Sequence, residues 1–269
     1  MSEVAATLRQ PALFIPHGGG PCFFMPDPRG VWRGMESYLK SLAASLPAKP
    51  KAILVVSGHW EEPAFVFTGA SEHPGLIFDY YGFPPETYQL TWPAPGAPWL
   101  AERASELIAA AGLPSAIDPE RGFDHGVFVP LKVAFSDADI PVVQMSLHAS
   151  LNPALHLAAG RALAPLRDEG VLIVGSGMSF HNLRAYGDPR VREPSSEFDL
   201  WLVHAAEAPF PERAKLLSQW QAAPFARLCH PREEHLLPLM VAAGASDEKG
   251  THDYGEEVLN GAVSGFRFA

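Results

Sequence analysis

The sequence predicts a single α/β domain, residues 1–269, whose central sheet is largely parallel or mixed and is flanked by helices. Short apolar runs bounded by Gly or Pro alternate along the chain with stretches whose apolar residues recur at helical spacing, and this alternation is typical of α/β folds. Because 47 % of the 269 residues are hydrophobic, the chain can bury one large core. Neither an internal repeat nor a low-complexity tract divides it, so we expect one domain.

Four apolar runs are predicted to be buried strands. Each is short, is mostly aliphatic and lacks the alternation of a strand that has one wet face, which favours a sheet covered on both faces. The runs are residues 12–15, 52–56, 142–147 and 171–174.

Helices are predicted between these strands. They cover residues 31–46, 98–111 and 153–167. Asn152 is expected to cap the third helix, with Pro153 in its first position, where a missing N–H costs nothing. After Pro194 the chain is predicted to be mainly helical. Residues 74–98 are rich in Pro, Gly and aromatic residues without a clear period, and we expect this aromatic segment to be a loop that covers a binding site.

The balance of charge narrows the classes of partner. The chain carries 20 Lys and Arg against 30 Asp and Glu, a formal net charge of −10, and has no basic run. We therefore expect no binding to nucleic acid and no attraction to an anionic membrane. The N-terminus lacks the pattern of a targeting signal, and no apolar run approaches the roughly 20 residues of a membrane span. Cys22 and Cys229 are too few for a disulfide framework, so a reduced, cytoplasmic setting is expected.

Histidines stand where three of the predicted strands stop. His17 follows the first run, His59 the second and His181 the fourth. Because the carboxyl ends of neighbouring strands in an open α/β sheet converge on one crevice, we expect these side chains to meet there. Neutral imidazole is a good ligand for zinc or ferrous iron, so the pattern indicates a metal site. The glycines after His17 also suggest a phosphate-binding turn, but they lack the Lys and the spacing of a P-loop. Taken alone, His59 equally fits a histidine hydrogen-bonded at the sheet edge.

Two further histidines lie beside carboxylates. His125 follows Asp124, and such a neighbour can orient an imidazole or raise its proton affinity, as a general base requires; taken alone, an ordinary loop turn explains the pair better. His235 lies at the predicted start of a short helix beside Glu233 and Glu234, and a carboxylate competes there as a metal ligand. The chain has neither the Gly-x-Ser-x-Gly of a nucleophile elbow nor the His-Glu-x-x-His of zinc proteases.

Taken together, six motifs resemble the class III extradiol ring-cleavage dioxygenases, and within them the branch of the DOPA 4,5-dioxygenases. They extend over nearly the whole chain, in the order Phe-Ile-Pro-His-Gly-Gly-Gly-Pro, Ser-Gly-His-Trp-Glu, Phe-Asp-Tyr-Tyr-Gly-Phe-Pro-Pro-Glu-Thr-Tyr, Asp-His-Gly-Val-Phe-Val-Pro-Leu, Gly-Ser-Gly-Met-Ser-Phe-His-Asn-Leu and Glu-His-Leu-Leu-Pro-Leu. The resemblance implies a single α/β domain, a divalent non-haem metal ion, and insertion of both oxygen atoms of O₂ into a catechol beside its hydroxyls.

The resemblance also implies roles for the histidines. His17 and His59 match two metal ligands, and His125 and His181 match the two histidines that transfer protons and orient the substrate. His235 falls where more distant relatives carry a glutamate ligand, and we expect it to be the third metal ligand. Whether His181 also binds the metal stays open.

Ferrous iron is the metal expected for activity, and zinc also suits an all-histidine site, although zinc cannot exchange electrons with O₂. The expected partners are O₂ and a single-ring, DOPA-like catechol, with Asp124, Tyr81 and Phe83 in contact with the catechol. Two other functions remain open at this point, a zinc-dependent hydrolase on the same metal site and a non-catalytic binding module of the same fold. The oligomeric state stays open as well, a homodimer included.

Overall fold

The computed structural model of the chain describes residues 8–68 and 71–269. Residues 1–7, which hold most of the N-terminal segment in which we expect no targeting signal, lie outside the described part, as do residues 69–70. Among the described residues, no helix has the length and apolar composition that crossing a bilayer requires.

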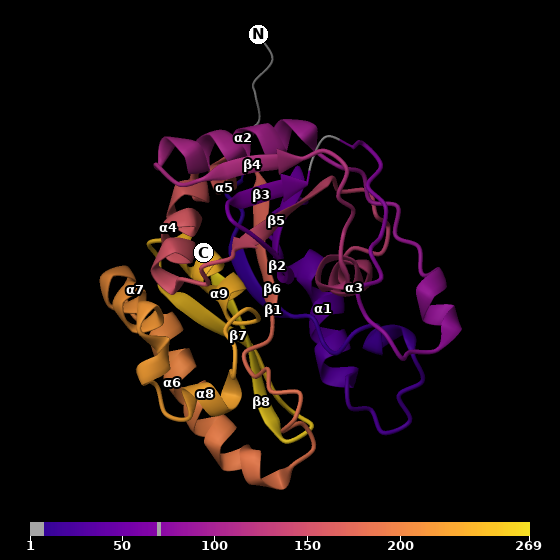
Figure 1. The fold of residues 1–269 in the computed structure, drawn as a ribbon, viewed down its shortest axis with the longest axis vertical. Coiled ribbons are helices and arrows are strands. Elements are labelled where there is room, and N and C mark those ends of the chain that lie inside the picture. Colours follow the sequence, from indigo (N-terminus) through magenta and orange to yellow (C-terminus); the bar gives the residue numbers. More distant parts are fainter. Residues whose placement is uncertain (1–7, 69–70) are drawn as a thin grey trace.

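The described residues form one eight-stranded sheet (Figure 1). Its strands are β1 (Ala12–Pro16), β2 (Ala52–Glu62), β3 (Phe65–Thr68), β4 (Ser115–Asp118), β5 (Val142–His148), β6 (Val171–Gly177), β7 (Gly250–Val258) and β8 (Gly261–Phe268). Their order in the sheet is β4-β3-β5-β2-β6-β1-β8-β7. The four central strands, from β5 to β1, are parallel to one another, whereas β8 pairs antiparallel with both β1 and β7, and β3 pairs antiparallel with β5. The predicted α/β class with a mixed, largely parallel sheet is confirmed.

Helices cover both faces of this sheet. The α-helices are α1 (Arg33–Ser45), α2 (Pro98–Ala110), α3 (His125–Ala134), α4 (Pro153–Leu163), α5 (Pro165–Asp168), α6 (Arg192–Glu207), α7 (Phe210–Ser218), α8 (Ala226–Cys229) and α9 (Leu237–Gly244), and the 3-10 helices are η1 (Cys22–Phe24), η2 (Pro85–Gln89), η3 (Pro189–Val191) and η4 (Trp220–Ala222). In Figure 1, α1 and α3 lie to the right of the sheet, and α4, α6, α7 and α9 lie to its left. Because both faces are covered, the central strands are buried along most of their length.

The third predicted helix begins as expected but ends early. The Asn152 side-chain oxygen accepts hydrogen bonds from the backbone N–H groups of Ala154 and Leu155, at 2.9 and 3.2 Å, and caps α4. Pro165 has no N–H to donate to the carbonyl of Arg161, so the helical ladder is interrupted there and α5 begins. The prediction of one continuous helix over 153–167 is therefore wrong.

The C-terminal end departs further from prediction. The chain after Pro194 is helical only as far as α9, and β7 and β8 then form an antiparallel hairpin. In its turn, Leu259 and Asn260 both have positive φ, 49° and 66°, as in a type I′ turn. Most of β7 is polar and partly exposed, so it offers no apolar run. The four-residue strands β3 and β4 are also missing from the prediction.

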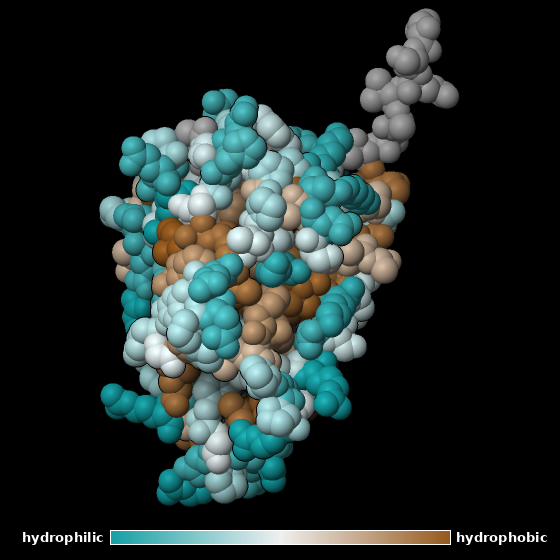
Figure 2. Space-filling model, turned by 90° about the vertical axis from the view of Figure 1, so that its right-hand side faces the viewer, coloured by the Kyte–Doolittle hydropathy of each residue, from teal (hydrophilic) through white to brown (hydrophobic). Residues whose placement is uncertain are grey.

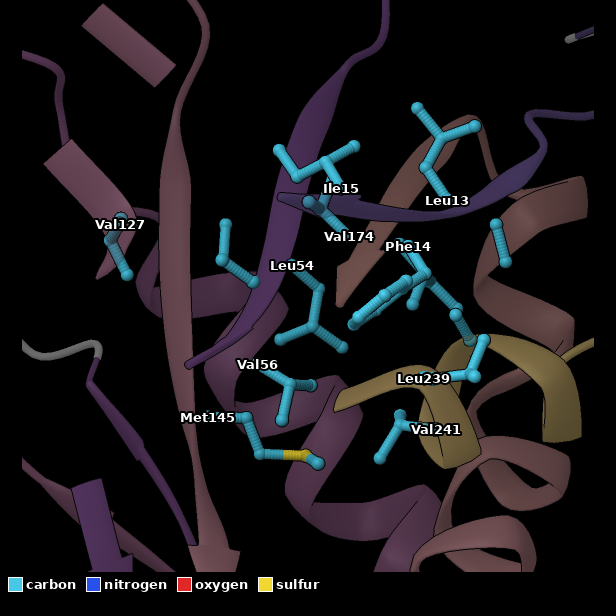
Figure 3. Packing of buried hydrophobic residues seen from close by; sticks show 14 of the residues in the cluster. Leu13, Phe14, Ile15, Leu54, Val56, Val127, Met145, Val174, Leu239 and Val241 are labelled. Carbon is cyan, nitrogen blue, oxygen red and sulfur yellow. The ribbon is translucent and has the colours of Figure 1, made fainter. Parts of the chain in front are cut away.

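The core fixes the strands whose ends carry the site. Figure 3 shows side chains of β1, β2, β6 and α9 packed in one cluster, among them Phe14, Leu54, Val174 and Leu239. Each of these four is at most 1 % exposed. Since burying one such side chain contributes roughly 1.5–3 kcal/mol, the centre of the sheet is firmly held. The neighbours β2, β6 and β1 are parallel, so their carboxyl ends lie together.

Candidate active site

A cleft of about 770 Å³ opens where the central strands end. Its lining includes all five histidines singled out in the sequence, His17, His59, His125, His181 and His235. The structure therefore brings together residues separated by more than two hundred positions in the chain. The remaining lining is largely glycine and apolar or aromatic side chains, among them Trp32, Phe83 and Leu259.

His17 directly follows β1 and is fixed by the neighbouring strand β6. Its backbone N–H donates to the carbonyl of Gly177 at 3.1 Å, and its Nδ1 lies 3.1 Å from the hydroxyl of Ser176. Gly18 then turns the chain with a φ of +79°, and a Cβ there would lie 2.4 Å from Cys22 Sγ. Glycine is therefore required for the turn that follows the histidine.

His59 lies inside β2, beyond the end of the predicted strand. The register of β2 on β5 shifts between Val56 and Glu61, and this irregularity directs His59 into the cleft. The loop before α9 approaches closely at this point, because a Cβ on Gly58 would lie 3.0 Å from the carbonyl oxygen of Glu234. The bulge and the glycine together bring β2 against the segment that carries His235.

The Nε2 atoms of three histidines converge in the cleft. The Nε2 of His59 lies 3.4 Å from that of His17 and 3.2 Å from that of His235. Nitrogen ligands about 2.1 Å from a tetrahedral metal ion are themselves about 3.4 Å apart, so these spacings fit one shared ion.

Each of these three imidazoles faces a polar partner through its other ring nitrogen. The distances are 3.1 Å from His17 Nδ1 to Ser176 Oγ, 3.7 Å from His59 Nδ1 to Asp79 Oδ2, and 2.9 Å from His235 Nδ1 to Glu234 Oε1. An Nδ1–H that donates to such an acceptor leaves the lone pair of Nε2 free for a metal. The polar surroundings of the three rings therefore suit ligation through Nε2.

The electrostatics of the cleft keep these imidazoles neutral. Burial, followed by repulsion from the other histidines, lowers the pKa of His17 and of His59 well below the ordinary value. Burial also lowers the pKa of His235 to about 4, although hydrogen bonding to Glu234 opposes the shift. Neutral imidazole is the form that binds a metal, so no proton has to be displaced near pH 7.

His125 is the first residue of α3, and it is held by Asp79. The same carboxylate oxygen, Oδ1, accepts hydrogen bonds from the backbone N–H of His125 at 2.9 Å and from its Nδ1 at 2.7 Å. Burial raises the pKa of Asp79, but these hydrogen bonds outweigh it and the net pKa is lowered. Asp79 is thus an anionic acceptor that fixes the ring of His125.

His181 follows β6 and is held by Glu234. Its Nδ1 lies 3.2 Å from Glu234 Oε1, the oxygen that also faces His235, and the rings of His181 and His235 stack with centroids 3.4 Å apart. Burial raises the pKa of Glu234, but the hydrogen bonds to the two histidines outweigh it and the net pKa falls well below the usual range. Glu234 is therefore ionised while it contacts both rings.

Two other groups of potential metal ligands in the cleft share residues with the three converging histidines. His17, His59 and His125 offer ring nitrogens that lie within 4.8 Å of one another, and the same holds for donor atoms of His181, Glu234 and His235. The second set includes the hydrogen-bonding contacts of Glu234 with His181 and His235, whereas the spacings of 3.4 and 3.2 Å around His59 join ring nitrogens that remain free to bind a metal. The donor chemistry of the cleft fits a divalent metal ion bound through imidazole.

Comparison with known proteins identifies the chemistry of this fold. Residues 11–265 match the family described as the catalytic LigB subunit of aromatic ring-opening dioxygenase. The chain belongs to this family. The protein is therefore an extradiol ring-opening dioxygenase, an oxidoreductase, as the six motifs predicted. This finding favours the oxygenase over the hydrolase and over the non-catalytic binding module.

Relatives of this dioxygenase cover most of its length. The 4,5-DOPA dioxygenase extradiol of Portulaca grandiflora is 44 % identical over 208 residues, 76 % of this chain and 75 % of the relative. The dioxygenase tasH of Hapsidospora irregularis is 40 % identical over 264 residues, 89 % of this chain and 79 % of the relative. A crystal structure of an uncharacterized protein from Escherichia coli K12 superimposes with a TM-score of 0.77 at 31 % identity, covering 97 % of this chain and 100 % of the other.

Asp124, which we expect to contact the catechol, lies behind the lining of the dioxygenase cleft. Its carboxylate is fully buried, accepts a hydrogen bond from Ser57 Oγ at 2.8 Å, and also accepts from the amide of Gln144. Burial raises the pKa of this carboxyl. The structure thus places Asp124 as an anchor for the residue that begins α3, His125.

The aromatic segment, residues 74–98, divides between the cleft and the core. It runs along the side of the molecule that Figure 2 shows, where apolar side chains gather between polar ones. Tyr81, 90 % exposed, and the half-buried Phe83 line the cleft, and their contact with a catechol stays a prediction. Trp92 is instead buried and donates from its indole N–H to the carbonyl of Phe135 at 3.1 Å. Only part of the segment borders the cleft.

Asp79 is the site residue that the sequence analysis missed. It stands in the irregular segment before η2, next to neither a histidine in the sequence nor the end of a strand. Its signal in the sequence is its place in the Phe-Asp-Tyr-Tyr motif. It lies three residues after Leu76, which forms a β-bridge with Phe123, and two after Ile77, whose N–H donates to the carbonyl of Phe123. That pairing carries Asp79 to the start of α3.

Proposed function

We propose that the protein is a non-haem, Fe(II)-dependent extradiol dioxygenase that opens a single-ring, DOPA-like catechol with O₂. The observation that carries the proposal is the convergence of three Nε2 atoms in one cleft, beside two more histidines that carboxylates orient. The relatives named 4,5-DOPA dioxygenase extradiol support the substrate class.

In this proposal His17, His59 and His235 hold the metal. Their Nε2 spacings match those of ligands that share an ion, and their lowered pKa values keep them neutral. When bound, ferrous iron would pass electrons from the catechol to O₂, and its positive charge would favour the deprotonated catechol. Zinc fits the same three nitrogens but has no accessible redox change.

His125 and His181 handle the protons of the catechol. Because a carboxylate accepts the Nδ1–H of each ring, Nε2 keeps its lone pair and can take the proton of a catechol hydroxyl, so that an O–H bond breaks as an N–H bond forms. One of the two histidines removes this proton, and the other hydrogen-bonds to the second hydroxyl and orients the ring. The pair exchange these roles when a proton is returned to the opened product.

The shape of the cleft suits one aromatic ring. Trp32 and Phe83 provide apolar walls on which a catechol ring can pack, and Tyr81 stands exposed at the rim. A volume of about 770 Å³ leaves space for a short side chain on the ring. These walls exclude water from the reacting atoms while a substrate is bound.

The test is iron reconstitution followed by a panel of catechols. Metal-free protein is loaded with Fe(II) under anaerobic conditions and mixed in air with DOPA and related single-ring catechols, while O₂ uptake and the yellow absorbance of the ring-opened product are recorded. We expect one O₂ consumed per catechol, no product from zinc-loaded protein, and loss of bound iron in His235→Ala. Iron-loaded protein of verified metal content that opens no catechol of the panel would contradict the proposal.

A further inference from the structure

Two carboxylates in the cleft each contact a pair of histidines. Asp79 faces His125 and His59, and Glu234 faces His181 and His235. Each pair joins one proposed metal ligand to one proposed proton-transfer residue. The two carboxylates come from unrelated segments, one before η2 and the other before α9, and still make the same kind of connection.

The distances show how firmly each histidine is held. Asp79 lies 2.7 Å from Nδ1 of His125 but 3.7 Å from Nδ1 of His59. Glu234 uses one oxygen for both of its contacts, at 2.9 Å to His235 and 3.2 Å to His181. Asp79 therefore holds mainly a proton-transfer residue, whereas Glu234 holds a proton-transfer residue and a metal ligand about equally.

We propose that Asp79 and Glu234 are paired positioning residues that fix the Nδ1–H tautomers of His125, His181 and His235 and thereby point the Nε2 atoms of these three rings into the cleft. This inference rests on the proposed function. Without an acceptor at Nδ1, a neutral imidazole is free to carry its proton on Nε2. A protonated Nε2 has no free lone pair, so this atom can neither bind a metal nor accept a proton.

Asp79 and Glu234 also affect the net charge of the proposed metal site. Three neutral imidazoles leave a divalent ion with its full charge of +2, which a glutamate ligand would reduce to +1. Asp79 and Glu234 place two negative charges one layer behind the imidazoles, so that the charge is balanced while the remaining coordination positions stay free for substrate and O₂. Arg232, the cation nearest to Glu234, lies 3.5 Å away and forms its closer contacts, 2.5 and 2.6 Å, with Glu61.

The experiment compares near-isosteric amides with matched controls. Asp79→Asn and Glu234→Gln remove the charges, and Asp79→Leu removes the acceptor as well. Glu233→Gln is the control for Glu234→Gln, because Glu233 is the preceding residue and pairs with Arg227 at 2.6 Å, away from the histidines. Asp139→Asn is the control for Asp79, because Asp139 pairs with Lys49 on the surface.

Four readouts are taken on the full chain: zinc affinity of the metal-free protein by chelator competition, histidine tautomers by ¹⁵N NMR, melting temperature, and kcat and KM of the iron-loaded enzyme. We expect Glu234→Gln to weaken zinc binding about 10–100-fold and to lower kcat, as loss of a partner behind a metal ligand does. Asp79→Asn should lower kcat by a similar factor with a much smaller change in zinc affinity and KM. Asp79→Leu should shift the proton of His125 from Nδ1 toward Nε2.

Two results would overturn the inference. The first is that both charge-removing variants have the same zinc affinity, histidine tautomers and kcat as their controls. The other is a fall in melting temperature that accounts for the lost activity while the tautomers stay unchanged, which is the behaviour of merely structural residues. Zinc affinity and tautomers are measured without substrate, so they decide the inference even if the wild-type enzyme opens none of the catechols tested.

Discussion

Replacing Gly126 by alanine should disturb the proposed metal site, because the added methyl group would displace His59. Gly126 is the second residue of α3, and a Cβ there would lie 2.4 Å from Ser57 Oγ and 2.9 Å from Cδ2 of His59. Both distances are shorter than real Cβ contacts allow, so the side chains of Ser57 and His59, or the backbone that carries them, must shift. The Ser57 hydroxyl also donates to Asp124 at 2.8 Å, and that buried hydrogen bond would be strained.

The cost follows from these contacts. Overpacking of a buried site costs about 1–3 kcal/mol, and the lower entropy of alanine in the unfolded chain returns about 0.4–1 kcal/mol of this. For a chain of this size, a net loss of about 1–2 kcal/mol lowers the melting temperature by roughly 2–8 °C. Displacement of His59 should also weaken metal binding.

The assay is thermal unfolding of the metal-free protein, together with zinc affinity, for Gly126→Ala and for a glycine control. Gly75→Ala serves as the control, because a Cβ at Gly75 meets nothing within 4 Å. We expect Gly75→Ala to bind zinc as the wild type does and to be as stable or slightly more stable, because alanine lowers the entropy of the unfolded chain here as well. The packing argument would be refuted if Gly126→Ala were as stable as Gly75→Ala and bound zinc with the same affinity.

Three other predictions concern the proton-transfer pair, the aromatic segment and pH. His125→Phe and His181→Ala should keep iron bound but lose about 10²–10⁴-fold in turnover, and wild-type turnover in both variants would contradict their role. Tyr81→Ala should raise KM with little change in melting temperature, since the side chain is 90 % exposed at the rim of the cleft, whereas a drop in melting temperature with unchanged kinetics would assign it to packing. Burial lowers the pKa of His156 to about 4 and of His230 to about 3. The unfolded chain therefore binds more protons than the folded one below about pH 6.5, and the free energy of unfolding should fall by about 2 kcal/mol for each of these imidazoles between pH 7 and pH 5; equal stability in urea at the two values would refute this.

The parts of the fold that sequence reasoning predicted are those with a strong local signal. The four apolar runs became β1, β2, β5 and β6, because parallel strands that are covered on both faces accommodate such runs between turn residues. The hairpin of β7 and β8 was missed for the opposite reason. Its polar edge strand has no apolar run, and Leu259 occupies a positive-φ turn position where Asn or Gly is usual.

The site divides in the same way. The five histidines were found because strand ends and motifs mark them, and the sheet order then brings them into one cleft. Asp79 was missed because its role depends on a long-range approach of the segment before η2 to the start of α3, which no local pattern encodes. Asp124 was expected in the cleft from its adjacency to His125, but successive residues at a helix start point in different directions.

The central claim is that His17, His59 and His235 hold the metal with which this dioxygenase works, and anomalous diffraction at the iron edge tests it most directly. Crystals of the anaerobically iron-loaded protein should show one anomalous peak within about 2.0–2.3 Å of the Nε2 atoms of these three histidines, with His125 and His181 outside ligand distance. A peak bound by His125, or by the carboxylate of Glu234 in place of His235, would contradict the account.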